Sequence, residues 1–143
     1  MLISDILHHK GSEVVKAVTT DSVMSAVRKL AERRIGALIV EDQWMKMIGI
    51  FSERDLLNAV ARRGASVLDA HVKDLMTSPV VTARSSDRVD AALAMMTLKR
   101  IRHLPVVDGA DLKGIVSIGD LVKQRFDEKE LEANVLREIS RRR

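Results

Sequence analysis

A repeat that covers most of the chain limits its possible folds more strongly than any other feature of the sequence. Residues 49–56 read GIFSERDL and return 65 positions later as GIVSIGDL at residues 114–121. Upstream, apolar residues recur 66 positions apart, and ISDIL at residues 3–7 matches VKDLM at residues 72–76. Self-similarity of this kind indicates one structural unit built twice. The sequence therefore predicts two related halves and a pair of related sites.

Each half is predicted to form a strand, a helix, two strands and a closing helix, which places the chain in the α/β class. In the first half, a helix with one apolar stripe starts at Val23, after capping oxygens from residues 20–22. Gly36 is expected to end this helix. The apolar runs 37–40 and 48–51 have the length of buried strands and predict an antiparallel pair. The remaining expected elements are a strand at residues 14–18 and a closing helix with Leu56, Leu57 and Val60 turned inward.

The second half repeats this order, and a further helix follows it. Its expected elements are strands at residues 80–82, 104–107 and 114–116 and helices from Val89 and from Ser117. Pro105 cannot donate to a ladder, so its strand belongs at an edge or turns that side away from a partner. Residues 127–143 are predicted to be an amphipathic helix with a basic tail, which packs on its own domain or contacts a second copy. We divide the chain into repeat 1 (1–64), repeat 2 (65–126) and this helix.

Composition narrows the class of protein and its setting. Hydrophobic residues make up 46% and charged residues 31% of the 143 residues, as in globular domains. No apolar run approaches the ~20 residues of a membrane span. The chain has no cysteine and its start lacks the pattern of a signal peptide, so we expect a cytoplasmic protein without membrane association. The four histidines have no metal-ligand spacing, so no metal site is expected.

The net charge of +4 is compatible with a nucleic-acid partner or with a small anionic ligand. Proteins that bind single-stranded nucleic acid stack bases on aromatic side chains. This chain has one Trp, two Phe and no Tyr, so such a platform is not favoured. Nucleic-acid binding through a basic surface stays the alternative function.

The repeated motif Gly-x-x-Ser-x-x-Asp has two interpretations. Ser52 with Asp55, and Ser117 with Asp120, have the spacing of a capping box that satisfies free N–H groups at a helix start. The same helix start offers N–H groups and a positive dipole end to a phosphate, and the aspartate can accept hydrogen bonds from a ribose diol. The glycine at the strand would leave room for a ligand to approach. The sequence leaves both interpretations open.

The two motifs, together with RIRHLPVV at residues 100–107, resemble a tandem pair of cystathionine-beta-synthase (CBS) domains over nearly all of residues 1–126. The resemblance implies two β-α-β-β-α repeats packed through their sheets in a pseudo-twofold pair, a Bateman module that commonly forms a homodimer. It also implies an adenosine-containing ligand in the clefts between the repeats. AMP is expected first, and ADP, ATP, S-adenosylmethionine or NAD(H) are further candidates. No cofactor is required.

The resemblance also assigns roles to individual residues of the two repeats. It assigns the ribose to Asp55 and Asp120, and ribose or phosphate to Ser52 and Ser117. By the same resemblance, Arg102 and His103 would contact the phosphates. The wall of the opposite cleft would be formed by Thr20 and Asp21. The adenine would contact Lys16 and Val18 or Thr82 and Ala83.

The repeats differ where the phosphates are expected. Repeat 1 has Gly36 and Ala37 at the positions that Arg102 and His103 occupy in repeat 2. A permanent cation and an imidazole beside Asp120 favour an anionic ligand, so we expect the tighter nucleotide site there. Alternatively, Arg102 is a surface residue whose stem covers the sheet.

We therefore expect a stand-alone regulatory or sensor module that binds an adenine nucleotide, forms a homodimer and acts on an unidentified partner protein. No catalytic residues are expected, because the sequence shows no cluster of nucleophile, base and orienting group. An enzyme that acts on the nucleotide is the third hypothesis.

Overall fold

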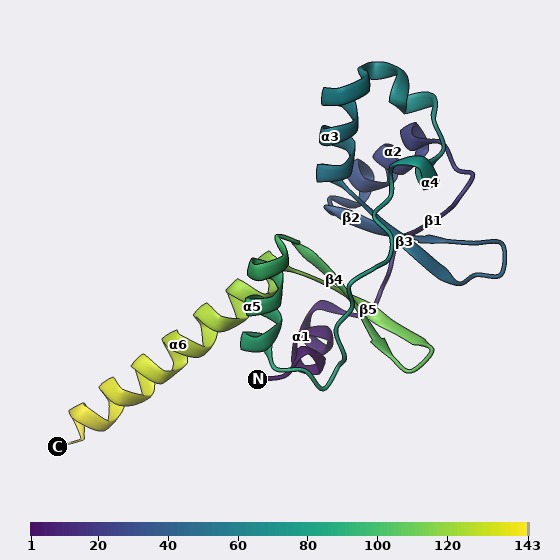
Figure 1. The fold of residues 1–143 in the computed structure, drawn as a ribbon. Coiled ribbons are helices and arrows are strands. Elements are labelled where there is room, and N and C mark those ends of the chain that lie inside the picture. Colours follow the sequence, from purple (N-terminus) through teal and green to yellow (C-terminus); the bar gives the residue numbers. More distant parts are fainter. Residues whose placement is uncertain (143) are drawn as a thin grey trace. The chain divides into compact units, whose positions relative to one another are not determined.

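The helices and strands in residues 1–142, the part of the chain that the computed structural model describes, belong to two units (Figure 1). The central unit is Glu13–Val81, and the terminal unit combines Met1–Ser12 with the segment from Thr82 onward. The central unit holds β1 (Lys16–Val18), α2 (Val23–Arg33), β2 (Ala37–Glu41), β3 (Met47–Ser52), α3 (Glu53–Arg63), the 3-10 helix η1 (Ala65–Asp69) and α4 (Val72–Leu75). The terminal unit holds α1 (Ile3–Lys10), α5 (Val89–Lys99), β4 (His103–Asp108), β5 (Asp111–Ser117) and α6 (Ile118–Arg141).

The sheet of the central unit has the strand order β1-β2-β3, with β2 parallel to β1 and antiparallel to β3. All five residues of β2 are buried, as the continuous apolar run predicts for a strand covered on both faces. Leu38 and Val40 share one face because side chains alternate along a strand. They belong to a core of eight buried residues: Ala17, Val23, Ala26, Leu30, Leu38, Val40, Phe51 and Val72.

The terminal unit has the hairpin β4-β5 in place of a three-stranded sheet. The strand expected at residues 80–82 is replaced by an isolated parallel bridge between Ala83 and Val106. Proline explains the difference. In the central unit, the Ile39 N–H donates to the Val15 carbonyl at 3.0 Å and so helps to join β1 to β2. The equivalent position in the terminal unit, 66 residues later, is Pro105. Proline has no N–H, so this hydrogen bond cannot form there.

The compact units are divided at other positions than the repeats of the sequence, because the opening helices of the two repeats are exchanged. The opening helix of repeat 1, α1, belongs to the terminal unit, and its counterpart in repeat 2, α4, belongs to the central unit. The Ile3 N–H of α1 donates to the Asp87 carbonyl ahead of α5, at 2.9 Å. Its counterpart in α4, the Val72 N–H, donates to the Asp21 carbonyl ahead of α2, at 2.8 Å. Residues 1–64 and 65–126 therefore describe the repeat in the sequence, whereas the compact units are cut after Ser12 and after Val81.

Two helix details differ from the sequence predictions. Gly36 does not end α2, because Arg34 takes the left-handed conformation, with φ of 53°, and Arg100 does the same after α5. On α3, Leu56 is half-buried as expected, but Leu57 is 68% exposed and Val60 is 38% exposed. The central core is filled from α2 and α4, so α3 contributes no fully buried residue.

The helices expected from Ser117 and over residues 127–143 are one continuous helix, α6, which ends at Arg141. No proline interrupts residues 118–141, so nothing in the backbone breaks the helix. Arg143 lies outside the described residues. No helix in residues 1–142 combines the length and the apolar content needed to cross a membrane.

Candidate functional site

Both repeated motifs form capping boxes, at the starts of α3 and α6. The Ser117 N–H donates to Asp120 Oδ2 at 2.8 Å, and the Asp120 N–H donates to Ser117 Oγ at 3.1 Å. Ser52 and Asp55 make the same pair of bonds, at 2.9 and 3.4 Å. The capping interpretation of the motif is confirmed in both units.

The cap leaves one donor at the start of α6 open. The Ile118 N–H donates to the Arg102 carbonyl at 2.8 Å, and the Asp120 N–H is used by the cap. The Gly119 N–H has no acceptor among residues 1–142. A helix start with a free N–H and the positive end of the dipole is suited to an anion.

Lys10, the last residue of α1, contacts the Asp120 carboxylate. Lys10 Nζ lies 2.6 Å from Asp120 Oδ2 and donates to the Ile115 carbonyl at 2.8 Å. Every bond that the Asp120 carboxylate makes within residues 1–142 reaches Oδ2, so Oδ1 is open to a further donor. Burial by itself would raise the pKa of Asp120, but the Lys10 ammonium and the Ser117 N–H outweigh burial and hold that pKa below its usual value.

Asp55 in the central unit has no ion pair with a cation within residues 1–142. Its Oδ1 accepts from the Thr77 hydroxyl at 2.9 Å, and its Oδ2 accepts from the Ser52 N–H and the Ser52 hydroxyl. Both carboxylate oxygens of Asp55 therefore already have donors, unlike those of Asp120.

Arg102 and His103 lie beside the start of α6. His103 is directly opposite Ser117 in the hairpin, a pairing that brings Cβ atoms within ~4.5–5.5 Å. Arg102 is exposed and precedes His103, and its carbonyl accepts from the Ile118 N–H. The structure thus brings these two basic residues together with Ser117 and Asp120.

The equivalent backbone in the central unit carries no basic side chain. Ala37 is opposite Ser52, and the Glu53 N–H donates to the Gly36 carbonyl at 3.0 Å. The two sites therefore share their backbone arrangement and differ in charge.

The remaining predicted residues of the central unit lie away from its helix start. Val18 pairs with Glu41 at one end of β2, whereas Ser52 pairs with Ala37 at the other, about 13 Å away at the rise of a strand. Thr20 is exposed and Asp21 follows it, so both lie beyond the Val18 end. Asp21 Oδ2 accepts from the Val18 N–H at 2.9 Å, which gives this carboxylate a structural role in the turn.

The residues predicted to contact adenine are Lys16 and Val18 in the central unit and Thr82 and Ala83 in the terminal unit. Lys16 Nζ lies 2.6 Å from Oε1 of the buried Glu41. In the terminal unit, Thr82 is exposed, and Ala83 is buried and bonded to β4.

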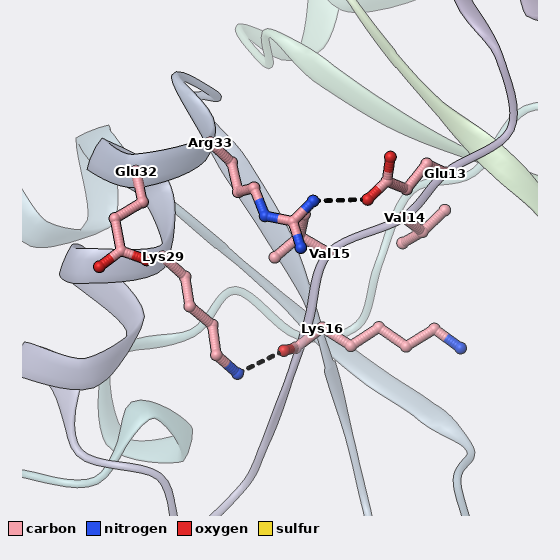
Figure 2. Close-up of a pocket in the computed structure, with 7 residues that line it drawn as sticks. All are labelled: Glu13, Val14, Val15, Lys16, Lys29, Glu32 and Arg33. Carbon is pink, nitrogen blue, oxygen red and sulfur yellow. Dashed lines mark hydrogen bonds and ion pairs between the residues drawn. The ribbon is translucent and has the colours of Figure 1, made fainter.

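A depression of about 390 Å³ lies beside the start of β1 (Figure 2). It is lined by Glu13, Val14, Val15, Lys16, Lys29, Glu32 and Arg33. Figure 2 shows Arg33 bonded to Glu13, at 2.6 Å, and Lys29 Nζ bonded to the Lys16 carbonyl, at 2.8 Å. Its lining is mostly charged and internally paired, whereas ligand sites are mostly apolar with a few polar groups. We therefore assign no ligand to this depression.

The sequence suggested that the glycines of the motif leave room for a ligand. The structure shows that they do not. A Cβ on Gly49 would collide with Met76 Sδ, and one on Gly114 would come within 2.8 Å of Leu7 Cδ2. The space beside each strand is filled by a side chain from α1 or from the end of α4. These glycines serve the packing of the exchanged opening helices.

Lys10 and Thr77, which contact Asp120 and Asp55, were not predicted from the sequence. Both residues come shortly after the matching segments 3–7 and 72–76. This match was the one feature of the sequence that could have pointed to them. No group of three or more His, Asp or Glu side chains in residues 1–142 is placed to hold a metal ion.

Comparison with known proteins identifies the family. The family model described as the CBS domain matches twice, at residues 3–62 and 72–127. The chain belongs to the CBS-domain family. A mitochondrial CBS-domain protein of Arabidopsis thaliana, CBSX3, is 34% identical over an alignment of 129 residues, and the match covers 85% of this chain and 63% of that protein. The chain spans between 34% and 63% of the length of the first three curated relatives.

Solved CBS structures share the fold. A CBS-domain protein of Agrobacterium tumefaciens is 40% identical, with a TM-score of 0.84 over 87% of this chain and 92% of that one. A CBS protein of Pyrobaculum aerophilum in complex with AMP is 29% identical, with a TM-score of 0.78 over 93% and 99%. The CBS pair of protein MJ0100, in complex with 5′-methylthioadenosine and S-adenosyl-L-methionine, is 28% identical, with a TM-score of 0.77 over 90% and 98%.

The contact between Lys10 and Asp120 predicts a pH-dependent stability. A carboxylate whose pKa is lowered in the fold stabilises it above the unfolded pKa of about 4, and this contribution is lost as the pH falls through the folded pKa. Lys10→Met removes the ammonium and keeps the apolar stem. We expect it to lower the free energy of unfolding by roughly 0.5–1 kcal/mol at pH 6 and to have a smaller effect at pH 3. Urea unfolding at both pH values measures this.

Lys113→Met is the matched control, because Lys113 Nζ lies 4.0 Å from Asp111 in an exposed pair. We expect a clearly smaller pH-dependent difference for it, because the lowered pKa of Asp108 is due mainly to the Ser85 hydroxyl and only in small part to Lys113. Equal losses for the Lys10 variant at pH 3 and pH 6 would contradict the role given to the ion pair.

Proposed function

We propose that this CBS protein is a regulatory module that binds an adenosine-containing ligand, with AMP as the first candidate, at the start of α6. The observation that carries the proposal is the open Oδ1 of Asp120 beside the free Gly119 N–H and the basic residues Lys10, Arg102 and His103. The complexes of similar CBS proteins with AMP, 5′-methylthioadenosine and S-adenosyl-L-methionine support an adenosine compound as the ligand class.

Each part of the site fits one part of such a ligand. Asp120 Oδ1 can accept from a ribose hydroxyl without displacing the cap, since the cap uses Oδ2. The free Gly119 N–H, the helix dipole and Arg102 favour the phosphate. Lys10 adds a positive charge at the same carboxylate and can turn toward a bound phosphate. The terminal-unit site is therefore proposed to bind more tightly than the central one.

The central-unit site is proposed as a weaker second site. Both oxygens of Asp55 already accept hydrogen bonds, so a ribose would have to compete with Thr77 and Ser52. Gly36 and Ala37 add no charge for a phosphate. We further propose that the protein forms a homodimer and that ligand binding alters a partner protein.

Calorimetric titration of the chain with AMP, ATP and NADH tests the proposal. We expect heat of binding with AMP, and nucleotide recovered unchanged after long incubation. The absence of heat with all three compounds would overturn nucleotide binding. A hydrolysed or transferred nucleotide would overturn the regulatory, non-enzymatic role.

A further inference from the structure

The second half of α6 carries an apolar stripe that its own unit does not cover. Leu131 is 65% exposed, and Val135 and Ile139 are each 50% exposed. Their spacing of four residues places them along one face of the helix. Figure 1 shows this half of α6 extending beyond α5 and α1 of its unit. A surface helix normally buries such a stripe, so this one is suited to a partner.

The charges on the same segment are separated along the helix. Its first part carries mostly acidic residues, namely Asp127, Glu128, Glu130 and Glu132, with Lys129 as the exception. Its last described part carries mostly basic residues, namely Arg137, Arg141 and Arg142, with Glu138 as the exception. Two copies in parallel would place the two acidic parts side by side, whereas two antiparallel copies place the mainly acidic part of one helix beside the mainly basic part of the other. The charge pattern therefore fits a second copy of this helix in one orientation.

We propose that residues 127–141 of α6, together with Arg142 directly after it, pair with the same segment of a second copy, antiparallel and centred on Val135. In this register Leu131 lies opposite the partner's Ile139, and Val135 lies opposite the partner's Val135. Glu128 then lies opposite the partner's Arg142 at each end of the apolar stripe, whereas the two exceptions, Lys129 and Glu138, lie opposite the partner's Arg141 and the partner's Glu132. This pairing is independent of the proposed nucleotide site, because it uses none of that site's residues.

Disulfide cross-linking tests the register directly, since the natural chain has no cysteine. Single variants Leu131→Cys, Val135→Cys and Ile139→Cys are oxidised in air with a copper catalyst, alone and in mixtures with one partner size-tagged. We expect Val135→Cys to link to itself. We expect Leu131→Cys and Ile139→Cys to link to each other at least about tenfold faster than either links to itself, because pairing raises their effective concentration. Ser140→Cys, on the opposite side of the helix, is the control for random collision.

Two outcomes would overturn the proposal. If Ile139→Cys links to itself as fast as to Leu131→Cys, the helices are not antiparallel in this register. If all variants link no faster than Ser140→Cys, a second copy does not cover the stripe. Val135→Glu gives an independent readout: we expect it to weaken self-association by about tenfold or more in sedimentation, because a charge enters the centre of the apolar stripe.

Discussion

Asp120→Ala is expected to weaken AMP binding by about 10- to 100-fold and to lower the free energy of unfolding by about 1 kcal/mol. The first effect follows because the ribose hydroxyls lose their acceptor, and the second because the cap of α6 is lost. Calorimetry measures the affinity, and urea unfolding measures the stability of the same variant. If stability falls while the affinity for AMP stays unchanged, Asp120 is only a helix cap.

Asp55→Ala is the matched control for this prediction. It removes an equivalent cap from α3 and also the bond from Thr77, so we expect a similar loss of stability. Its effect on AMP affinity should be clearly smaller, because the tighter site is proposed at α6. Equal losses of affinity in both variants would contradict the proposed inequality of the two sites.

Gly49→Ala is expected to lower the free energy of unfolding by about 1–3 kcal/mol, the usual cost of overpacking. The new methyl would collide with Met76 Sδ and would lie 2.9 Å from Met76 Cγ and 3.2 Å from the Thr77 carbonyl oxygen. The thioether can turn away, but the backbone carbonyl moves only with the strand. Chemical denaturation of the variant measures the loss.

Two further variants separate this contact from a general effect of alanine. Combining Gly49→Ala with Met76→Ala should cost less than the sum of the single changes, since the collision is removed. Gly119→Ala should stabilise by a few tenths to about 1 kcal/mol, because its Cβ would meet only Ser117 Oγ at 3.6 Å and it lies in a helix. A Gly49→Ala protein as stable as the natural one would show that α4 does not pack here.

Local features of the fold were predictable from residue types a few positions apart. The capping boxes join residues three positions apart, so Ser52 with Asp55 and Ser117 with Asp120 were recognisable in the sequence. The buried strand β2 followed from its unbroken apolar run. The order strand, helix, strand, strand, helix along each half was predictable as well, except for the first strand of the second half, where Pro105 removes a donor. To predict that exception, one would need to know which residue of β4 lies beside residues 80–83. No local pattern in the sequence contains this information.

The charge difference between the two sites was also visible in the sequence, by aligning the repeats. His103 pairs with Ser117, and the Arg102 carbonyl accepts from the Ile118 N–H, so the backbone of both residues lies beside this motif. The sequence did not show that Asp120 keeps one oxygen open while Asp55 does not. That difference depends on which atoms Lys10 and Thr77 reach, and thus on side-chain geometry.

The amino-acid sequence alone determined that a unit is duplicated, that each copy caps a helix with Ser and Asp, and that one copy carries the cations. These features depend on bonds and periodicities within a few residues. Only the tertiary structure decided that the opening helices are exchanged, that Leu7 and Met76 fill the space beside the glycines, and that Lys10 meets Asp120. The last contact joins residues 110 positions apart, and folding of the whole terminal unit is what brings them together.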